Sequence, residues 1–151
     1  MARCAGDGRS LSGGIPVTWW ADLVGLPYAD NARGPDRFDC WGLARHVLQR
    51  ECGVALPLHD GIDTRDGPAV SREMAAQASL GPFVAVTDPR AFDLVLMTGS
   101  PTARLAGHVG VMVNCKRLLH VWRRTDSCVM SLDDYRVSRG VLGFYRHEDL
   151  A

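Results

Sequence analysis

Residues 38–48 read Phe38-Asp39-Cys40-Trp41-Gly42-Leu43-Ala44-Arg45-His46-Val47-Leu48 and predict an amphipathic helix with a cysteine in its first turn. From Cys40 onward, apolar side chains recur at steps of three and four residues, which places them on one helical face. Asp39 is suited to cap the amino end and Gly53 to end the helix. A thiol in that first turn feels the positive end of the helix macrodipole, which favours the thiolate. The stretch therefore indicates a cysteine nucleophile, although a buried cysteine also serves often as a small core residue.

Length and composition exclude several classes of protein. The chain has 151 residues, of which 46% are hydrophobic, so we expect one domain with a real core. Seventeen basic residues balance seventeen acidic ones, and no run reaches the roughly 18 apolar residues that span a bilayer. We therefore expect neither sequence-specific nucleic-acid binding nor membrane insertion. The amino terminus has no apolar core of signal-peptide length, which predicts synthesis in the cytoplasm.

The five cysteines form no Cys-x-x-Cys pair, and their number is odd. This pattern predicts reduced thiols, without a disulfide framework or a thiolate zinc site. No metal and no cofactor is expected.

The order of the predicted elements indicates an α+β fold. Residues 1–16 are rich in Gly and Ser and predict a flexible or partner-ordered arm, so that the folded domain would span residues 17–151. A short helical pattern at 19–24 contains two adjacent tryptophans, which pack internally or cover a partner surface. A further helix is predicted at 69–79 and a single capped helical turn at 131–135. Strands of a mostly antiparallel sheet are predicted at 83–86, 92–97, 108–113, 118–122, 128–130 and 141–145, with a hairpin turn at 114–117.

Two histidines on this predicted hairpin could serve the cysteine. His108 and His120 are twelve residues apart, and a tight turn would place them side by side or diagonally on one face. A nucleophilic cysteine needs an imidazole as base, and the imidazole needs a second polar group to fix its tautomer. Taken singly, each histidine could instead be an ordinary hydrogen-bonded residue of a half-buried strand. The remaining histidines, at positions 46, 59 and 147, are expected to face solvent.

The sequence resembles the NlpC/P60 cysteine peptidases, and within them the small tail-associated members of phages and gene transfer agents. The resemblance covers about residues 19–146 and implies a papain-like α+β fold, with helices packed on a mostly antiparallel sheet. Its motifs are Gly25-Leu26-Pro27-Tyr28, Phe38-Asp39-Cys40-Trp41-Gly42-Leu43, Phe92-Asp93-Leu94-Val95, Gly107-His108-Val109-Gly110-Val111-Met112-Val113 and Leu119-His120.

The resemblance also implies a reaction. Cys40 would be the nucleophile, His108 the general base and acid, and His120 the polar residue that orients it. The family cleaves peptidoglycan stem peptides, commonly between γ-D-glutamyl and a diamino acid. A tail-borne member would bind tail hub or baseplate proteins and open the wall in the periplasm of the target cell, so that DNA can enter.

Three neighbours of the nucleophile would help to bind substrate. Tyr28 matches a family tyrosine that shapes the oxyanion site, or it anchors its loop. Asp39 would combine substrate contact with helix capping, and Trp41 either walls the substrate site or only covers the helix start.

Two other functions compete with peptidoglycan hydrolysis. The chain could be a structural tail-tip or baseplate adaptor that uses a peptidase fold with little or no activity, which the glycine-rich arm and the tryptophan pair would fit. It could also catalyse another acyl transfer through the same cysteine, as an amidase or acyltransferase.

Overall fold

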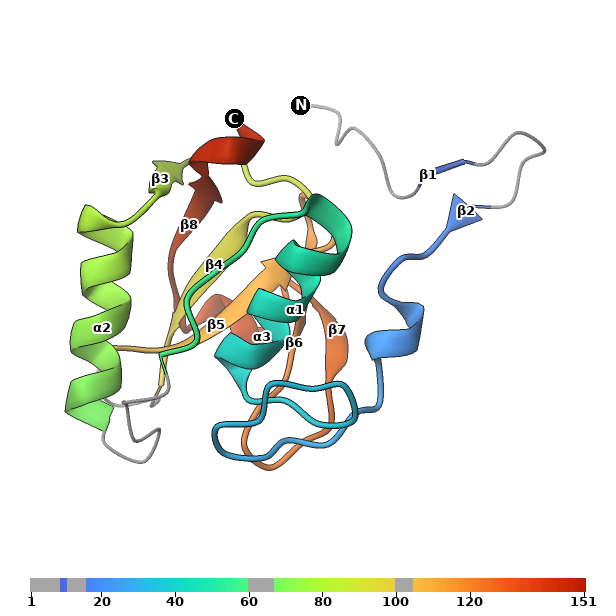
Figure 1. Ribbon diagram of the computed structural model, residues 1–151, viewed down its shortest axis with the longest axis horizontal. Helices are drawn as coiled ribbons and strands as arrows, with labels where there is room; N and C mark the ends of the chain where they lie inside the picture. The colour runs from blue at the N-terminus through green and yellow to red at the C-terminus, as the bar shows by residue number, and fades with distance from the viewer. Residues whose placement is uncertain (1–8, 11–15, 60–66, 100–104) are drawn as a thin grey trace.

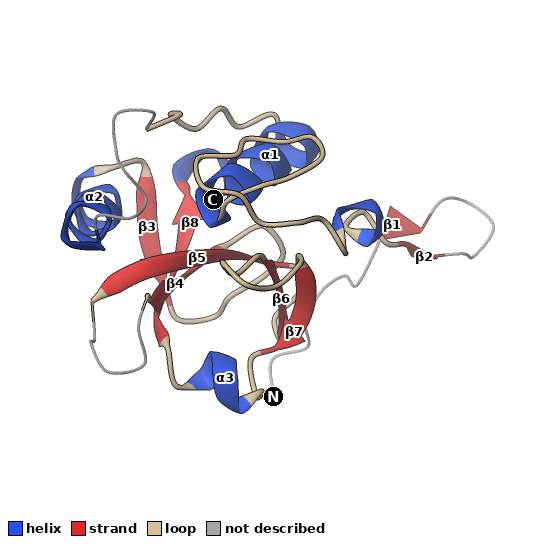
Figure 2. Ribbon diagram, turned by 90° about the horizontal axis from the view of Figure 1, so that it is seen from below, coloured by secondary structure: helices blue, strands red, loops and turns tan. Residues whose placement is uncertain are grey.

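The computed structural model describes residues 9–10, 16–59, 67–99 and 105–151, and within them the predicted α+β class is confirmed. Six strands form one antiparallel sheet in the order β3-β8-β4-β5-β6-β7. Its strands are β3 (Phe83–Val86), β4 (Leu94–Thr98), β5 (Ala106–Met112), β6 (Arg117–His120), β7 (Cys128–Ser131) and β8 (Val141–His147). The helices are η1 (Ala21–Leu23), α1 (Cys40–Cys52), α2 (Gly67–Leu80), α3 (Tyr135–Ser138) and η2 (Glu148–Leu150). Helices α1 and α2 lie on one side of the curved sheet and α3 on the other (Figures 1 and 2).

Helix α1 forms where the sequence predicts it, and its two ends have the expected caps. The Asp39 carboxylate accepts the Gly42 amide at 2.6 Å, so that one free donor of the first turn is satisfied. Gly53 ends the helix in the left-handed region, with φ of 69°. Leu43, Ala44, Val47 and Leu48 are buried. The apolar stripe of α1 therefore faces the core and fixes the orientation of the first turn.

Two hydrophobic clusters lie on opposite sides of the sheet. The larger one joins α1 to the sheet through residues such as Val47, Val111 and Leu119. The smaller one lies toward α3 and includes Met112, Met130 and other buried side chains. Burial of these apolar side chains holds the sheet between the two groups of helices.

Two segments differ locally from the sequence expectations. The single helical turn occurs at α3 rather than at 131–135, because the Asp134 side chain caps it by accepting the Arg136 amide. Within the arm expected at 1–16, Arg9–Ser10 pair with Pro16–Val17 as strands β1 and β2, and the rest lies outside the described residues.

The cysteines only partly follow the expectation of reduced thiols. Cys40, Cys52 and Cys128 form no disulfide, whereas Cys115 is in a disulfide, so the expectation is wrong for Cys115. No helix in the described part of the chain has the length and apolar character needed to cross a membrane.

One motif residue proves to be structural. Asp93, immediately before β4, is 1% exposed and accepts two hydrogen bonds from the Arg146 guanidinium of β8, at 2.8 and 2.7 Å. It also accepts the Arg90 amide at 2.8 Å. A buried carboxylate needs such a set of partners, and here they tie the turn before β4 to the neighbouring strand β8.

Candidate active site

Cys40 begins α1 and lines a cavity of about 540 Å³. The cavity wall also includes His108 and Val109 of β5, Trp122 after β6, and apolar residues of α2 such as Met74. The backbone amide of Val109 donates a hydrogen bond to the Cys40 sulfur. The start of α1 and the strand that carries His108 therefore meet at the thiol.

His108 and His120 are brought together by the predicted hairpin. The His108 Nε2 and His120 Nδ1 atoms are 2.9 Å apart, and the two residues are only 5% and 1% exposed. Val111 of β5 pairs with Leu119 of β6, and this register continued by one position sets His120 opposite Gly110. The histidines are thus diagonal neighbours, one of the two arrangements expected from the sequence. Because His108 uses Nε2 toward His120, its Nδ1 is the nitrogen left for chemistry at the cavity.

Trp122 closes the histidine pair from one side. Its ring centroid lies 4.3 Å from that of His120 in an edge-on arrangement, and 5.8 Å from that of His108. An aromatic wall of this kind excludes water from the imidazoles and limits their rotation.

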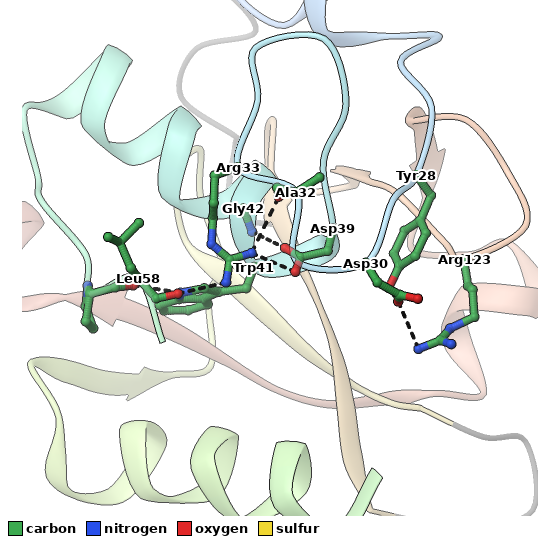
Figure 3. A network of polar contacts seen from close by, with 10 residues as sticks. Tyr28, Asp30, Ala32, Arg33, Asp39, Trp41, Gly42, Leu58 and Arg123 are labelled. Atoms are coloured by element: carbon green, nitrogen blue, oxygen red, sulfur yellow. Dashed lines mark hydrogen bonds and ion pairs between the residues drawn. The ribbon is translucent and has the colours of Figure 1, made fainter. Parts of the chain in front are cut away.

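Tyr28 lies close enough to Cys40 that a charged thiolate would raise the tyrosine pKa. Its hydroxyl donates to the Asp30 carboxylate at 3.0 Å, and Asp30 in turn pairs with Arg123 at 3.3 Å (Figure 3). Burial and the Asp30 hydrogen bond both raise the pKa of Tyr28. The phenol therefore stays protonated and can act as a hydrogen-bond donor at the rim of the cavity.

Asp39 is buried beside the nucleophile, and both of its carboxylate oxygens are engaged. Oδ1 accepts the Gly42 amide at 2.6 Å and Oδ2 accepts the Arg33 Nη1 at 2.7 Å. The same guanidinium donates to the Leu58 carbonyl at 2.8 Å, so Arg33 links the loop before α1 to the segment after it (Figure 3). Asp39 carries the capping role, and Arg33 balances its charge.

Trp41 lines the cavity, and a hydrogen bond holds its side chain in place. Its indole nitrogen donates to the Pro57 carbonyl at 2.8 Å, and its ring lies 5.2 Å from that of His59. His59 also lines the cavity and lies 3.3 Å from the Glu73 carboxylate of α2, so it is not the solvent-facing residue that was expected. The same expectation is wrong for His147, which is 6% exposed and packs edge-on against Phe83.

A model of the NlpC/P60 family matches residues 25–139, which is most of the chain. The chain belongs to the NlpC/P60 family. Similar folds occur in a lipoprotein-like NLP/P60 protein from Staphylococcus aureus, at 19% identity and a TM-score of 0.57, and in NlpC2 from Trichomonas vaginalis, at 18% and 0.57. The NlpC/p60 domain of the peptidoglycan hydrolase SagA is 23% identical, with a TM-score of 0.52.

These three structures share the fold over a similar fraction of this NlpC/P60 chain. They cover 83%, 83% and 82% of it, whereas it covers 37%, 43% and 87% of theirs, in the same order. The chain thus spans less than half the length of the first two and most of the SagA domain. No match was found among curated protein sequences.

Protonation of the cysteine and histidines in this NlpC/P60 site is governed by burial. Burial, and then the Asp39 charge, raise the pKa of Cys40 to about 11, although the amides of Val109, Trp41 and Cys40 itself oppose the shift. Burial lowers the pKa of His108 to about 3, with a further contribution from a charge on His120. The amides at the helix start favour the thiolate, as expected, but burial outweighs them. At rest the Cys40 thiol and both imidazoles are therefore neutral.

The same burial predicts acid destabilisation of the protein. Burial and the nearby Arg136 lower the pKa of His120 to about 4, so both histidines are harder to protonate in the fold than in the unfolded chain. The unfolded chain takes up these protons below about pH 6.5, so stability is fully present above that pH and falls as the pH approaches 4. We expect up to about 1.4 kcal/mol of lost stability per pH unit for each histidine. Urea titrations at pH 7, 6 and 5 test this, and an unfolding free energy that stays constant to pH 5 would contradict it.

A close approach of backbones holds Asp39 and Cys40 in place. A Cβ atom added at Gly42 would lie 2.1 Å from the Ala32 carbonyl oxygen, which accepts the Asp39 amide. Gly42→Ala must therefore push the loop away from the start of α1, and we expect a loss of about 3 kcal/mol. Gly67→Ala is the control, because a Cβ there meets none of the described residues within 4 Å. Thermal and urea unfolding measure both variants, and equal stability of the two would count against this packing.

Arg33 and Met130 are candidate site residues that the sequence analysis missed. Arg33 holds Asp39, and Met130 contacts His120. Arginine in a polar loop and methionine in an apolar strand are both ordinary, and neither carried a recognisable signal.

Proposed function

We propose that the chain is a cysteine endopeptidase that hydrolyses peptidoglycan stem peptides. The observation that carries this proposal is that Cys40 and His108 line one cavity, while His120 contacts His108. Cys40 begins α1 and receives the Val109 amide, while His108, the residue before Val109 on β5, is held by His120 at 2.9 Å. A nucleophile, a base and a group that orients the base are the parts that acyl transfer requires.

The reaction would begin with a neutral Cys40 thiol and a neutral His108 imidazole. His108 takes the Cys40 proton as the sulfur attacks the amide carbonyl, because a free thiolate is disfavoured by burial. The backbone amides of Cys40 and Trp41, which act on the sulfur, would also stabilise the developing oxyanion. Protonated His108 then gives its proton to the leaving amine, the C–N bond breaks and a thioester remains. His108 next removes a proton from water, which attacks the thioester and releases the carboxylate product and the thiol.

The neighbours of Cys40 would serve the substrate. Tyr28 remains protonated near the sulfur, so its hydroxyl can turn from Asp30 to the oxyanion. Trp41, fixed by Pro57, would form a wall of the substrate site, and Asp39 would hold the helix start against the cavity.

The substrate bond and the setting of the enzyme form a finer part of the proposal. The bond would be that between γ-D-glutamyl and a diamino acid, and the enzyme would travel on a phage-like tail to open the wall of a target cell. Residues 1–16 would be an arm ordered by hub or baseplate proteins, and residues 17–151 the peptidase domain. The resemblance of the sequence motifs supports this setting, and the name of the SagA relative supports the substrate class.

Digestion of a defined wall tests the proposal. The purified chain would be incubated with diaminopimelate-type peptidoglycan, and the released fragments identified by mass spectrometry. We expect fragments with a new amino terminus at the diamino acid. Absence of any fragment, with a synthetic γ-D-glutamyl-diaminopimelate peptide also left intact, would overturn it in favour of a structural adaptor.

A further inference from the structure

The second nitrogen of His120 faces a methionine sulfur. His120 Nε2 lies 3.0 Å from Met130 Sδ. His120 is on β6 and Met130 on the neighbouring strand β7, where the ladder pairs Leu118 with Met130 and His120 with Cys128. Both side chains are buried, at 1% and 9% exposed. The contact thus lies inside the protein, on the side of His120 away from His108.

The chemistry of sulfur decides where the proton on His120 lies. A thioether has no hydrogen to donate and can only accept, whereas a neutral imidazole has one N–H and one lone pair. Burial keeps His120 neutral. An N–H at Nε2 makes the 3.0 Å contact attractive, while a lone pair there would face the lone pairs of sulfur. The proton therefore sits on Nε2, and Nδ1 carries the lone pair.

The position of the proton on His120 determines the position of the proton on His108. Its Nε2 lies 2.9 Å from the His120 Nδ1, so one hydrogen must lie between the two atoms. Since His120 Nδ1 carries a lone pair, His108 must supply that hydrogen from Nε2. Nδ1 of His108 is then unprotonated, which is the state that a base for Cys40 needs. If His120 were protonated at Nδ1 instead, His108 would accept that hydrogen at Nε2 and carry its own N–H at Nδ1. His108 could then not accept the Cys40 proton.

We propose that Met130 is a positioning residue that fixes the tautomer of His120 and, through it, that of His108. It would act as the carboxylate or backbone carbonyl does behind many functional histidines. For its effect on turnover, the proposal rests on the peptidase function proposed above. For its effect on the tautomers, it depends only on the unliganded protein.

Nuclear magnetic resonance of protein with ¹⁵N-labelled histidine tests the tautomers directly. Long-range ¹H–¹⁵N spectra near pH 7 should show protonated Nε2 and unprotonated Nδ1 for both His108 and His120. Met130→Leu keeps the volume but removes the acceptor, and we expect a mixture of tautomers at both rings. Met112→Leu is the matched control, because Met112 is fully buried in the same cluster and should leave the spectra unchanged. A wild-type His120 protonated at Nδ1, or wild-type spectra from Met130→Leu, would overturn the proposal.

Kinetics supply the second readout. With a stem-peptide substrate, Met130→Leu should lower kcat by about tenfold with KM within about twofold, and Met112→Leu should match wild type. An unchanged kcat in a variant whose tautomers have shifted would also overturn the positioning role. If wild type cleaves nothing, the peptidase function fails, while the spectra still decide whether Met130 sets the tautomers.

Discussion

Cys40→Ala is expected to lower the hydrolysis of stem peptides below the limit of detection. Cys40 is the one thiol among the described residues that line the cavity, and loss of a nucleophile typically costs about 10⁶-fold in kcat. The fold should be retained, because the change removes one sulfur atom from a residue at the edge of a cavity. Fragment release from diaminopimelate-type peptidoglycan, followed by mass spectrometry, measures the activity. Circular dichroism and the melting temperature measure the fold.

Cys52→Ala is the matched control for this variant. Cys52 ends the same helix, is also half-buried and is in no disulfide, but it is not among the residues that line the cavity. We expect wild-type rates from it. Cleavage by Cys40→Ala at more than a trace of the wild-type rate would show that another group performs the chemistry.

His108→Gln is expected to lower kcat/KM by about 10³-fold, with the fold retained. The glutamine side chain can still hydrogen-bond to His120, but it cannot take the Cys40 proton or return it to the leaving amine. Because burial holds the cysteine pKa near 11, the thiol depends on this base at neutral pH. The rate of Cys40 alkylation by iodoacetamide at pH 7 should fall together with the activity. Progress curves on a synthetic stem peptide measure the loss of kcat/KM.

His46→Gln controls for loss of an imidazole elsewhere. His46 lies half-buried on α1, packs against Phe38 and is absent from the cavity wall. It should leave both the activity and the alkylation rate unchanged. If His108→Gln retained wild-type activity, the base would have to be another group and the assignment of His108 would be wrong.

The sequence was most informative where local rules act. The spacing of apolar residues and the capping preferences of Asp39 and Gly53 predicted α1 to the residue. The turn at 114–117 and the twelve-residue interval were enough to bring His108 beside His120, since an antiparallel hairpin has few registers. Such features depend on neighbours in the chain.

The rest of the site depends on residues far apart in the sequence. The pKa of Cys40 follows mainly from how deeply the fold buries the thiol, and no local pattern reports that depth. Arg33 reaches the Leu58 carbonyl only because the loop and the segment after α1 fold back on each other. Met130 was predicted as one apolar residue of a strand, and its contact with His120 comes from the register of β6 with β7.

The central claim is that Cys40 forms a covalent acyl-enzyme during turnover, and its direct capture would test that claim best. Wild-type protein would be mixed with a synthetic γ-D-glutamyl-diaminopimelate stem peptide and quenched in acid within milliseconds to seconds, because thioesters survive at low pH. Peptide mapping by mass spectrometry should then show the mass of the amino-terminal part of the substrate on the peptide that contains Cys40. Product formation without any adduct on Cys40, or with the adduct on another residue, would contradict it.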